Sequence, residues 1–353
     1  MKRTVLHIIC VMNAALMLLL YVSCSDNRAD YYAEYANTPR GNFEALWTIM
    51  DRHYCFFDLK ERELGINWNQ VYNKYSPSIS ENMSSRALFE VLSSMIGELR
   101  DGHVNLISSY DFGRNWHWKT DYPANYSKDI QDKYLGTDYI IANGTYCYTI
   151  LDDNIGYLAI TSFENTISGS QLNAMFNYMM MCNGLIIDIR DNGGGDVRAV
   201  DDLASRFTEE RIFTGYSCYK NGPGHNDFSN LEENWLEPDH NNLRWVKPVV
   251  LLVNRGCYSS ANDLANVMKS IPTVTLVGDT TGGGGGLPFV SELPNGWFVR
   301  FSSAPTLDTS LRHIESGVDP DIRLDMDQAD MNKGVDTYIE YARNIINDRL
   351  VNP

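Results

Sequence analysis

Apolar and polar positions divide the chain into three parts with different patterns. Residues 5–22 are almost entirely apolar, and residues 42–99 carry large apolar side chains at helical spacing. From residue 154 onward, short apolar runs alternate with amphipathic segments. The first pattern is typical of a targeting segment, the second of helices with one buried face, and the third of a mixed α/β body.

The helical part extends over residues 42–107, and two apolar stripes define its helices. The first stripe consists of Phe43, Leu46, Trp47, Met50 and Tyr54. The second stripe predicts a helix over residues 85–99, which a serine at its start can cap. The sequence Asp-Gly-His follows this helix and ends at His103. Residues 108–153 are rich in Gly, Asn, Asp and aromatic side chains, so we expect an irregular connecting segment there.

The body over residues 154–353 alternates predicted strands and helices. Buried apolar runs predict strands over residues 155–160, 185–189, 248–253, 273–277 and 297–301. Amphipathic segments predict helices over residues 171–181, 196–207 and 259–269. This alternation indicates βαβ crossovers and a largely parallel sheet. Residues 217–246 interrupt the alternation and are expected to form a surface insertion.

The N-terminal apolar segment has the layout of a bacterial secretory signal. Two basic residues precede the apolar run, which stops at Ser23-Cys24. A small residue before a cysteine is typical of a lipoprotein cleavage site, so we expect residues 1–23 to be a signal peptide, Cys24 to be lipidated and residues 24–41 to form a tether. Plain secretion and a retained membrane-anchoring helix are the alternatives. We therefore place the protein in the bacterial cell envelope, lipid-anchored at the outer membrane, in the periplasm or on the cell surface.

Composition and charge exclude several functions. The chain has 353 residues, 44% of them hydrophobic, which is enough for a sizeable core. Its formal net charge is −16 and it has no basic run, which argues against nucleic acid as a partner because phosphate binding needs clustered Lys and Arg. The cysteines after Cys24 are widely spaced and form no C-x-x-C pair; they are Cys55, Cys147, Cys182, Cys218 and Cys257. We expect neither a disulfide framework nor a metal site.

A glycine-rich turn follows the strand predicted over residues 185–189. The run Asp-Ile-Arg-Asp-Asn-Gly-Gly-Gly begins at Asp188 and ends at Gly195, where a helix is predicted to start. Glycines permit positive φ and leave backbone N–H groups open to close approach, so such a turn can bind phosphate or stabilise an oxyanion. The spacing of known phosphate loops is missing. A plain strand-to-helix turn is the other interpretation.

Ser259 opens the helix predicted over residues 259–269. A serine there is usually a helix cap, but a helix N-terminus also favours negative charge developing on a substrate carbonyl, which suits a nucleophile. A serine nucleophile needs a base, for which His103 beside a glycine is the candidate and His313 the main rival. Glu315 can orient an imidazole, or it simply belongs to a polar turn.

Six motifs follow one another along the chain. They are Leu-x-Asp-Gly-His-Val, Gly-Tyr-Leu-x-Ile, Leu-Ile-Ile-Asp-Ile-Arg-Asp-Asn-Gly-Gly-Gly, Ser-Ser-Ala-Asn, Val-Gly-Asp-Thr-Thr-Gly-Gly and Gly-Val-Asp-Pro-Asp-Ile. This set, within residues 42–325, resembles peptidase family S41, which contains the C-terminal processing proteases and the tricorn core protease. The resemblance implies an α/β fold with a crotonase/ClpP-like core of ββα units and a small N-terminal helical region.

The resemblance also implies roles for individual residues. Ser259 falls on the nucleophile, His103 on the base of the tricorn-like branch and Glu315 on the acid behind that base. The oxyanion would be held by backbone N–H groups, those of Ser260 and of Gly193 or Gly194.

Several positions depart from the family pattern and define the subtype. Gly284 stands where members with a Ser/Lys dyad have the lysine, and Pro288 stands at the position of its glutamine partner. The tricorn-like branch has a serine before the histidine that links it to the glutamate, and that position is Gly102 here. Asn262 replaces a family glutamate, which we expect to concern the helix rather than the chemistry. Residues 108–153 are too few for the PDZ domain that many members carry.

The sequence therefore predicts an exported serine peptidase or endopeptidase that acts on peptides or unfolded proteins through an acyl-enzyme, with no cofactor. Its contact with the membrane would be the lipid on Cys24. Two alternatives stay open. One is a catalytically weak or inactive lipoprotein that binds peptide or another ligand in the same cleft, which Gly102 motivates. The other is a crotonase-type enzyme acting on a thioester, although an acyl-CoA would need basic residues that this acidic chain does not obviously supply.

Overall fold

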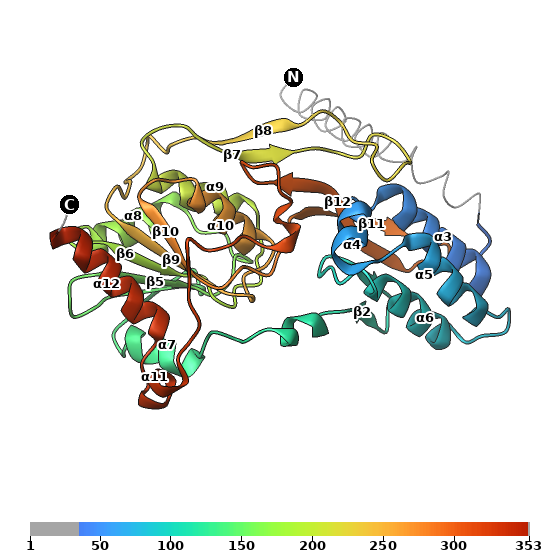
Figure 1. The fold of residues 1–353 in the computed structure, drawn as a ribbon, viewed down its shortest axis with the longest axis horizontal. Helices are drawn as coiled ribbons and strands as arrows, with labels where there is room; N and C mark the ends of the chain where they lie inside the picture. Colours follow the sequence, from blue (N-terminus) through green and yellow to red (C-terminus); the bar gives the residue numbers. More distant parts are fainter. Residues whose placement is uncertain (1–34, 352–353) are drawn as a thin grey trace, which may run out of the picture.

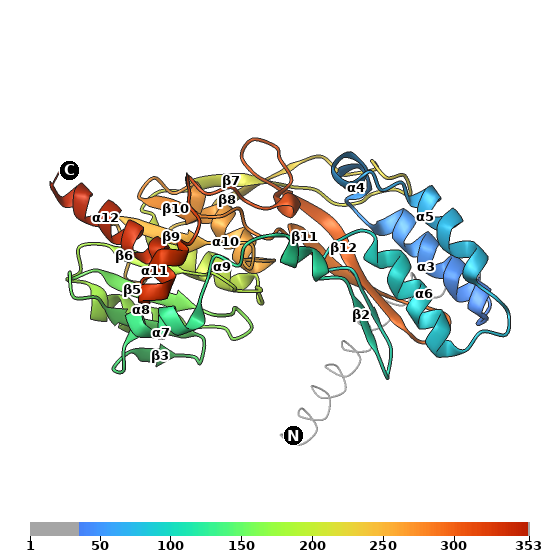
Figure 2. The same cartoon turned by 60° about the horizontal axis from the view of Figure 1, so that its bottom comes forward.

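The computed structural model describes residues 35–351, and the predicted signal segment with Cys24 lies outside them. The chain forms two lobes (Figure 1). One lobe packs the N-terminal helices against a six-stranded sheet, and the other carries helices on both faces of a seven-stranded sheet. The view in Figure 2 shows the same two lobes, with long strands of the first sheet extending from one lobe towards the other.

The first lobe begins with four helices. They are α3 (Pro39–His53), α4 (Phe57–Leu64), α5 (Trp68–Tyr75) and α6 (Ser85–Gly97), with a 3-10 turn at Ser76–Ser78. Helices are thus found at both places where the apolar stripes predicted them. The first begins earlier than residue 42 because the side chain of Thr38 accepts a hydrogen bond from the Gly41 N–H and caps the helix. Ser84 caps α6 in the same way.

The sheet of the first lobe has the strand order β2-β1-β12-β7-β8, and β11 also pairs with β12. Its strands are β1 (Asn105–Ile107), β2 (Phe112–Arg114), β7 (Ile212–Ser217), β8 (Glu232–Leu236), β11 (Gly286–Glu292) and β12 (Phe298–Leu307). The long β12 pairs with β1 near its start and with β7 at its end, so it links the helical lobe to the hairpin above the second lobe.

The sheet of the second lobe has the order β13-β10-β9-β6-β5-β4-β3. Its strands are β3 (Ile140–Ala142), β4 (Tyr146–Ile150), β5 (Gly156–Ile160), β6 (Leu185–Asp188), β9 (Val249–Val253), β10 (Val274–Gly278) and β13 (Ile322–Arg323). The five strands from β13 to β5 are parallel, and β4 and β3 are antiparallel. Both β6 and β9 are fully buried, as their continuous apolar runs indicate.

Helices cover both faces of this second sheet. They are α7 (Lys128–Leu135), α8 (Gly169–Met179), α9 (Arg198–Ala204), α10 (Ser260–Lys269), α11 (Gln328–Lys333) and α12 (Thr337–Val351). The apolar sides of α8, α9 and α10 share one core cluster with β6 and β9, whereas α12 and the end of α7 pack on the other face. The predicted α/β fold with a small N-terminal helical region is therefore confirmed.

The expectation of an irregular segment over residues 108–153 is wrong in part. That segment contains β2, α7 and the β3–β4 hairpin, which extends the second sheet. These elements are short and carry little periodicity, so the pattern did not predict them. The turn of the hairpin did have a signal, because Asn143 and Gly144 both adopt positive φ, as the Asn-Gly pair favours. Residues 217–246 likewise include β8, which pairs with β7.

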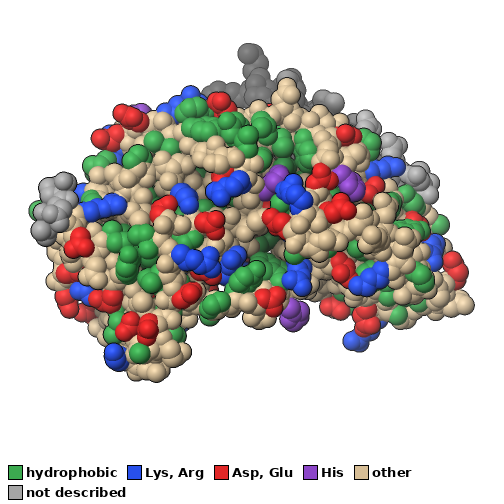
Figure 3. Space-filling view, viewed as in Figure 1, with side chains coloured by type: hydrophobic (Ala, Val, Ile, Leu, Met, Phe, Trp, Pro, Cys, Tyr) green, Lys and Arg blue, Asp and Glu red, His purple; other side chains and the backbone are tan. Residues whose placement is uncertain are grey.

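The described residues show neither a bridged cysteine nor a helix suited to the membrane interior. Cys55, Cys147, Cys182, Cys218 and Cys257 are all free thiols. Within residues 35–351, no helix combines the length and hydrophobicity that a bilayer crossing requires. Acidic and basic side chains are interspersed over both lobes on the face shown in Figure 3.

Candidate active site

Ser259 lies in a strained turn between β9 and α10. It has φ 57° and ψ −123°, a conformation that residues with a side chain rarely adopt. The turn is held on both sides, since the Ser259 N–H donates to the Gly283 carbonyl at 2.9 Å and the Tyr258 N–H donates to the Asn192 carbonyl at 3.0 Å. This turn places Ser259 at the N-terminus of α10, where the helix dipole stabilises negative charge that develops during attack by the serine.

His103 meets Ser259 across the boundary between the two lobes. Its Nε2 lies 3.0 Å from the Ser259 Oγ, within hydrogen-bond distance. The imidazole is only 3% exposed, and this burial lowers the pKa of His103 to about 4, although the nearby Asp101 charge opposes the shift. The ring is therefore neutral at pH 7, and Nε2 can accept the serine proton.

His313, the rival base, lies elsewhere. Its ring packs edge-on against Phe56 at 5.6 Å between ring centroids, and burial lowers the pKa of His313. It makes no hydrogen bond to Ser259 in the described part of the chain. The geometry favours His103 as the partner of the serine.

Asp101 is the carboxylate nearest to the His103 segment. It accepts hydrogen bonds from the His103 backbone N–H at 2.7 Å, the Tyr258 hydroxyl at 3.1 Å and the Ser302 hydroxyl at 2.9 Å. Burial disfavours its charge, but Lys60, His103 and these hydrogen bonds outweigh burial and lower the pKa of Asp101. An ionised Asp101 thus fixes the backbone at His103 and favours positive charge on its ring.

Glu315 does not contact His103. Its Oε1 accepts from the Lys60 ammonium at 2.8 Å, and its Oε2 accepts from the Gly285 backbone N–H at 3.0 Å. Burial, with the Asp101 charge adding to it, raises the pKa of Glu315. Burial also opposes the charge of Lys60, but Glu315 and Asp101 reverse this and raise the pKa of Lys60. A direct contact between Glu315 and the imidazole is therefore not made, and Glu315 instead forms a buried ion pair with Lys60 and holds the loop at Gly285.

Nδ1 of His103 is buried and has no hydrogen-bond partner among the described residues. The backbone of Gly286 raises the pKa of His103, but this effect is smaller than those of burial and of the neighbouring charges. The orientation of the ring thus depends on its packing, which includes an edge-on contact with Tyr258 at 5.1 Å between centroids.

The packing of Tyr258 explains two departures from the family pattern. A Cβ at Gly102 would lie 2.8 Å from Tyr258 Cζ, so a serine cannot stand there while the tyrosine ring occupies this space. A Cβ at Gly284 would lie 2.6 Å from the same ring, and Gly284 has φ +81°. The ring therefore excludes both the serine of the tricorn-like pattern and the lysine of the Ser/Lys pattern.

Asn262 has a structural part, as expected from its place in α10. Its side-chain amide donates to the Ile314 carbonyl at 3.0 Å and its oxygen accepts from the Thr281 hydroxyl. These bonds tie α10 to the 3-10 turn Ile314–Ser316, which carries Glu315.

The glycine-rich turn after β6 lies directly against Ser259. A Cβ at Gly194 would lie 2.8 Å from Ser259 Cβ and 2.9 Å from the Ser260 nitrogen. The Gly194 N–H donates to the Asn192 side chain at 2.9 Å, whereas the N–H groups of Gly193 and Ser260 donate to no described residue. Of the three predicted oxyanion donors, Gly193 and Ser260 are thus the available ones, and Gly194 provides the close approach between the two turns.

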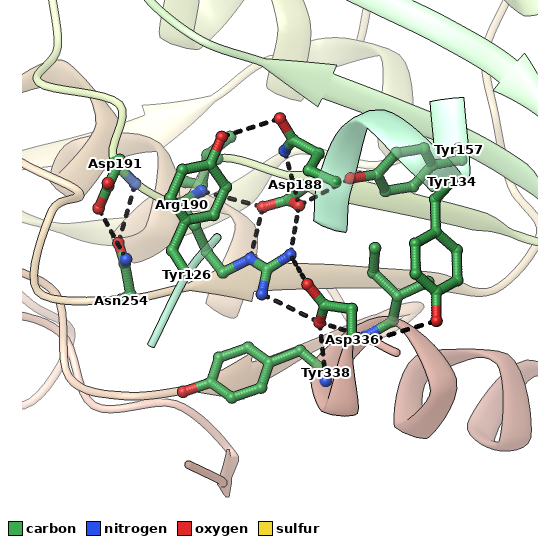
Figure 4. Close-up of polar contacts among 12 residues, drawn as sticks. Tyr126, Tyr134, Tyr157, Asp188, Arg190, Asp191, Asn254, Asp336 and Tyr338 are labelled. Atoms are coloured by element: carbon green, nitrogen blue, oxygen red, sulfur yellow. Dashed lines mark hydrogen bonds and ion pairs between the residues drawn. The ribbon is translucent and has the colours of Figure 1, made fainter. Parts of the chain in front are cut away.

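A buried ion cluster holds the base of this turn (Figure 4). The Arg190 guanidinium lies between Asp188, at 2.7 Å, and Asp336, at 2.9 Å, and all three side chains are fully buried. The next residue, Asp191, has φ 59° and exchanges hydrogen bonds of 2.9 Å with Asn254, which follows β9. The turn that carries the glycines is therefore fixed to β6, β9 and the start of α12.

A cavity of about 430 Å³ opens beside the Ser259–His103 pair. Its lining includes Ser260, residues 284–288 and side chains of α9, α10 and β8. The arrangement of a buried imidazole, a strained serine, free N–H groups and an adjoining cavity can support acyl transfer to the serine. Within residues 35–351, no group of three or more His, Cys, Asp or Glu could hold a metal ion.

Reasoning from the sequence missed the contributions of Asp101, Lys60 and Tyr258. Asp101 had a signal, because it stands two residues before His103 in the quoted motif. Lys60 had none, because its burial beside Glu315 depends on the packing of α4 against a segment some 250 positions away along the chain.

Two family models match the chain. Residues 154–324 match Peptidase family S41, and residues 35–97 match the Tricorn protease C1 domain. The carboxy-terminal processing protease CtpA of Bacillus subtilis (strain 168) is 28% identical over 177 residues, which are 50% of this chain and 36% of that protein. The chloroplastic carboxyl-terminal-processing peptidase 3 of Arabidopsis thaliana is 27% identical over 203 residues, 55% of this chain and 37% of that protein. The match thus spans about a third of the length of these curated relatives.

Solved structures have the same fold. A crystal structure of a protein from Parabacteroides merdae ATCC 43184 has a TM-score of 0.82 and 50% sequence identity, covering 88% of this chain and 97% of that one. Mature CPAF complexed with lactacystin has a TM-score of 0.68 at 14% identity, covering 88% of this chain and 97% of that one. The second likeness concerns the fold alone.

Proposed function

Because the chain belongs to peptidase family S41, we propose that it is a serine peptidase in which Ser259 attacks the carbonyl of a peptide bond and His103 takes the serine proton. The observation that carries the proposal is the 3.0 Å distance between His103 Nε2 and Ser259 Oγ, with the serine in a strained turn at a helix N-terminus. Peptides and unfolded proteins are the proposed substrates.

Acylation follows from this arrangement. The proton of the Ser259 hydroxyl passes to His103 Nε2 while the serine oxygen bonds to the substrate carbonyl carbon. The carbonyl oxygen becomes an oxyanion, for which the N–H groups of Gly193 and Ser260 are the proposed donors. The imidazolium then gives its proton to the leaving amine as the C–N bond breaks, and an ester on Ser259 remains. Water attacks this ester by the same steps, releasing the carboxylic acid and restoring the serine.

The buried carboxylates have separate parts in this proposal. Asp101 favours the imidazolium electrostatically and fixes the backbone of His103. Glu315 was predicted to orient the imidazole; its contacts support a positioning part instead, in which it holds the Gly285 N–H and with it the loop beside Ser259. Among the described residues Nδ1 of His103 has no hydrogen-bond partner, which leaves this position for water or substrate.

Hydrolysis of an unfolded protein tests the proposed activity. The purified protein is incubated with unfolded casein in H2 18O, and new C-termini are identified by mass spectrometry. We expect cleavage with 18O in each new carboxylate, and loss of cleavage in Ser259→Ala and His103→Ala. His313→Ala, which changes another buried histidine, is the matched control and should retain cleavage. Cleavage by Ser259→Ala at the wild-type rate would refute the assignment.

A second candidate is a protein that binds peptide in the same cleft without turnover. This candidate is favoured because, within residues 35–351, Nδ1 of His103 has no hydrogen-bond partner and Glu315 bonds to Lys60 instead. It predicts that an unfolded peptide binds with measurable affinity while no new C-terminus forms, even over long incubation at high protein concentration.

We also propose export and lipid attachment at Cys24, which rest on the apolar segment ending at Ser23-Cys24. When a bacterial host is grown with an alkyne-bearing palmitate, the protein should carry the label and should be found in the membrane fraction. Cys24→Ala should lose the label, and a labelled Cys24→Ala variant would contradict the proposal.

A further inference from the structure

We infer that the cavity beside Ser259 selects a basic side chain, lysine or arginine, on the residue that supplies the attacked carbonyl, and that Asp263 and Asp201 are the residues that recognise it. This inference rests on the proposed function, since it assigns specificity to the same site. The cavity contains both Ser259 and His103, so a side chain that enters it belongs to a residue at the scissile bond.

Asp263 is placed to receive a cation from such a side chain. It lies on the first turn of α10, and its own N–H donates to the Ser259 carbonyl at 2.9 Å, so the two residues are one helical turn apart. Its carboxylate lines the cavity and has no hydrogen bond or ion pair with any residue in 35–351. Burial, with the charge of Asp201 adding to it, raises the pKa of Asp263 to about 6. Asp263 is partly buried, and a carboxylate that has lost part of its hydration without gaining a partner is destabilised, so a substrate cation would supply the missing partner.

The other charges around the cavity have the same sign. Asp201 on α9 and Glu233 on β8 also line it, and no Lys or Arg within residues 35–351 does. The pKa of Asp201 is raised by partial burial and by neighbouring Asp202. His103 is neutral at pH 7, because burial lowers its pKa to about 4. The cavity is therefore negative at neutral pH, which favours a cationic group over a neutral or anionic one.

The chemistry of the lining suits an organic cation rather than a metal ion. Apolar side chains of Val197, Val267 and Leu287 share the lining with the carboxylates. A lysine or arginine combines an apolar stem with a charged end, so both kinds of lining would be used. The carboxylates are not gathered into a set of metal ligands in the described residues.

Two irreversible peptide phosphonates test this inference with the full-length protein. They share one sequence and differ at the phosphonate residue, which carries a lysine side chain in one and norleucine in the other. Both are phosphonate esters that phosphonylate an activated serine with release of the ester alcohol, so the adduct is identified by intact mass and the rate of labelling is measured directly. We expect the lysine probe to react about tenfold faster or more, in line with the strength of hydrogen bonds to charged groups. Equal rates, or a faster norleucine probe, would overturn the inference.

Asparagine substitutions identify the carboxylates responsible. Asp263→Asn and Asp201→Asn keep the side-chain shape and should each lower the lysine-to-norleucine rate ratio several-fold. Asp202→Asn removes the same charge from the neighbouring position of α9, outside the cavity lining, and is the matched control. A ratio as high in Asp263→Asn as in Asp202→Asn would overturn the assignment of Asp263. Labelling by neither probe, nor by a small fluorophosphonate, would instead refute the proposed activity on which the inference depends.

The pH dependence of the rate ratio is a second readout. Asp263 gains its full charge only above its pKa of about 6, whereas the lysine probe stays cationic throughout. The ratio should therefore rise between pH 5 and pH 7 in the wild-type protein, and rise less in Asp263→Asn. A ratio that does not change over this range would contradict recognition by Asp263.

Discussion

Removal of Lys60 tests whether Glu315 acts through the buried ion pair. The pair lies at 2.8 Å with side chains only 7% and 2% exposed, and Glu315 also holds the Gly285 N–H beside the serine. In Lys60→Met, an unbranched apolar side chain of similar length replaces the cation. Glu315 and Asp101 then share a buried region with no cation between them.

The magnitude follows from distance and burial. At an effective dielectric constant of about 20, two unit charges at this separation attract by roughly 6 kcal/mol, and the loss of hydration offsets much of this. Breaking a buried pair by removing one partner costs about 3–5 kcal/mol. For a chain of this size we expect the Tm to fall by about 4–7 °C.

A double-mutant cycle measures the coupling. The free energies of unfolding of wild type, Lys60→Met, Glu315→Gln and the double variant are determined by urea denaturation at pH 7.5. The double variant should be more stable than the sum of the single effects predicts, by about 2–3 kcal/mol, because neither charge is then left unpaired. Fluorophosphonate labelling of the double variant should also recover relative to Glu315→Gln. The positioning role of Glu315 would be refuted if the two substitutions had additive effects on the free energy of unfolding and the double variant were labelled as slowly as Glu315→Gln.

Three further perturbations probe the neighbouring groups. As the pH is lowered, the labelling rate should fall with a midpoint near the His103 pKa of about 4, since the neutral ring predominates above this pH. A midpoint at or above pH 6.5, in protein that circular dichroism shows to be folded, would contradict the burial of His103. Asp101→Asn should move that midpoint further down and slow labelling about tenfold or more, because the charge that favours the imidazolium is lost. Gly194→Ala should abolish labelling, since its Cβ would lie 2.8 Å from Ser259 Cβ at a φ of +95°, whereas Gly193→Ala, whose Cβ meets open space, should cost far less. Similar rates for the two alanine variants would argue against the close approach of the turns.

The elements that could be predicted from the sequence are those whose apolar positions form a local pattern that matches the face they bury. The apolar stripes of α3 and α6 and the continuous apolar runs of β6 and β9 fix both the type and the place of these elements. The segment over residues 108–153 was not predicted, because β3 and α7 are short and gain their stability from the neighbours on which they pack.

The two residues proposed as nucleophile and base could be found from the sequence, but the contacts of the neighbouring carboxylates could not. Ser259 and His103 stand in motifs with local signals, a helix start and an Asp-Gly-His turn, and the structure brings them to 3.0 Å. The partner of Glu315 depends on α4 packing against the segment at residue 315, and the ring of Tyr258 fills the space at Gly102. These contacts join segments that are distant in the chain, so no local pattern contains them.

Labelling of the purified protein with a fluorophosphonate probe shows whether Ser259 is an activated nucleophile, because this probe reacts with such a serine whatever the natural substrate is. Wild type, Ser259→Ala and His103→Ala are compared at pH 7.5, with His313→Ala as the matched control. We expect one added phosphonyl group on Ser259 in wild type and in His313→Ala, and none in Ser259→Ala or His103→Ala. A folded wild-type protein that stays unlabelled, or a labelled Ser259→Ala variant, would show that Ser259 is not the activated nucleophile.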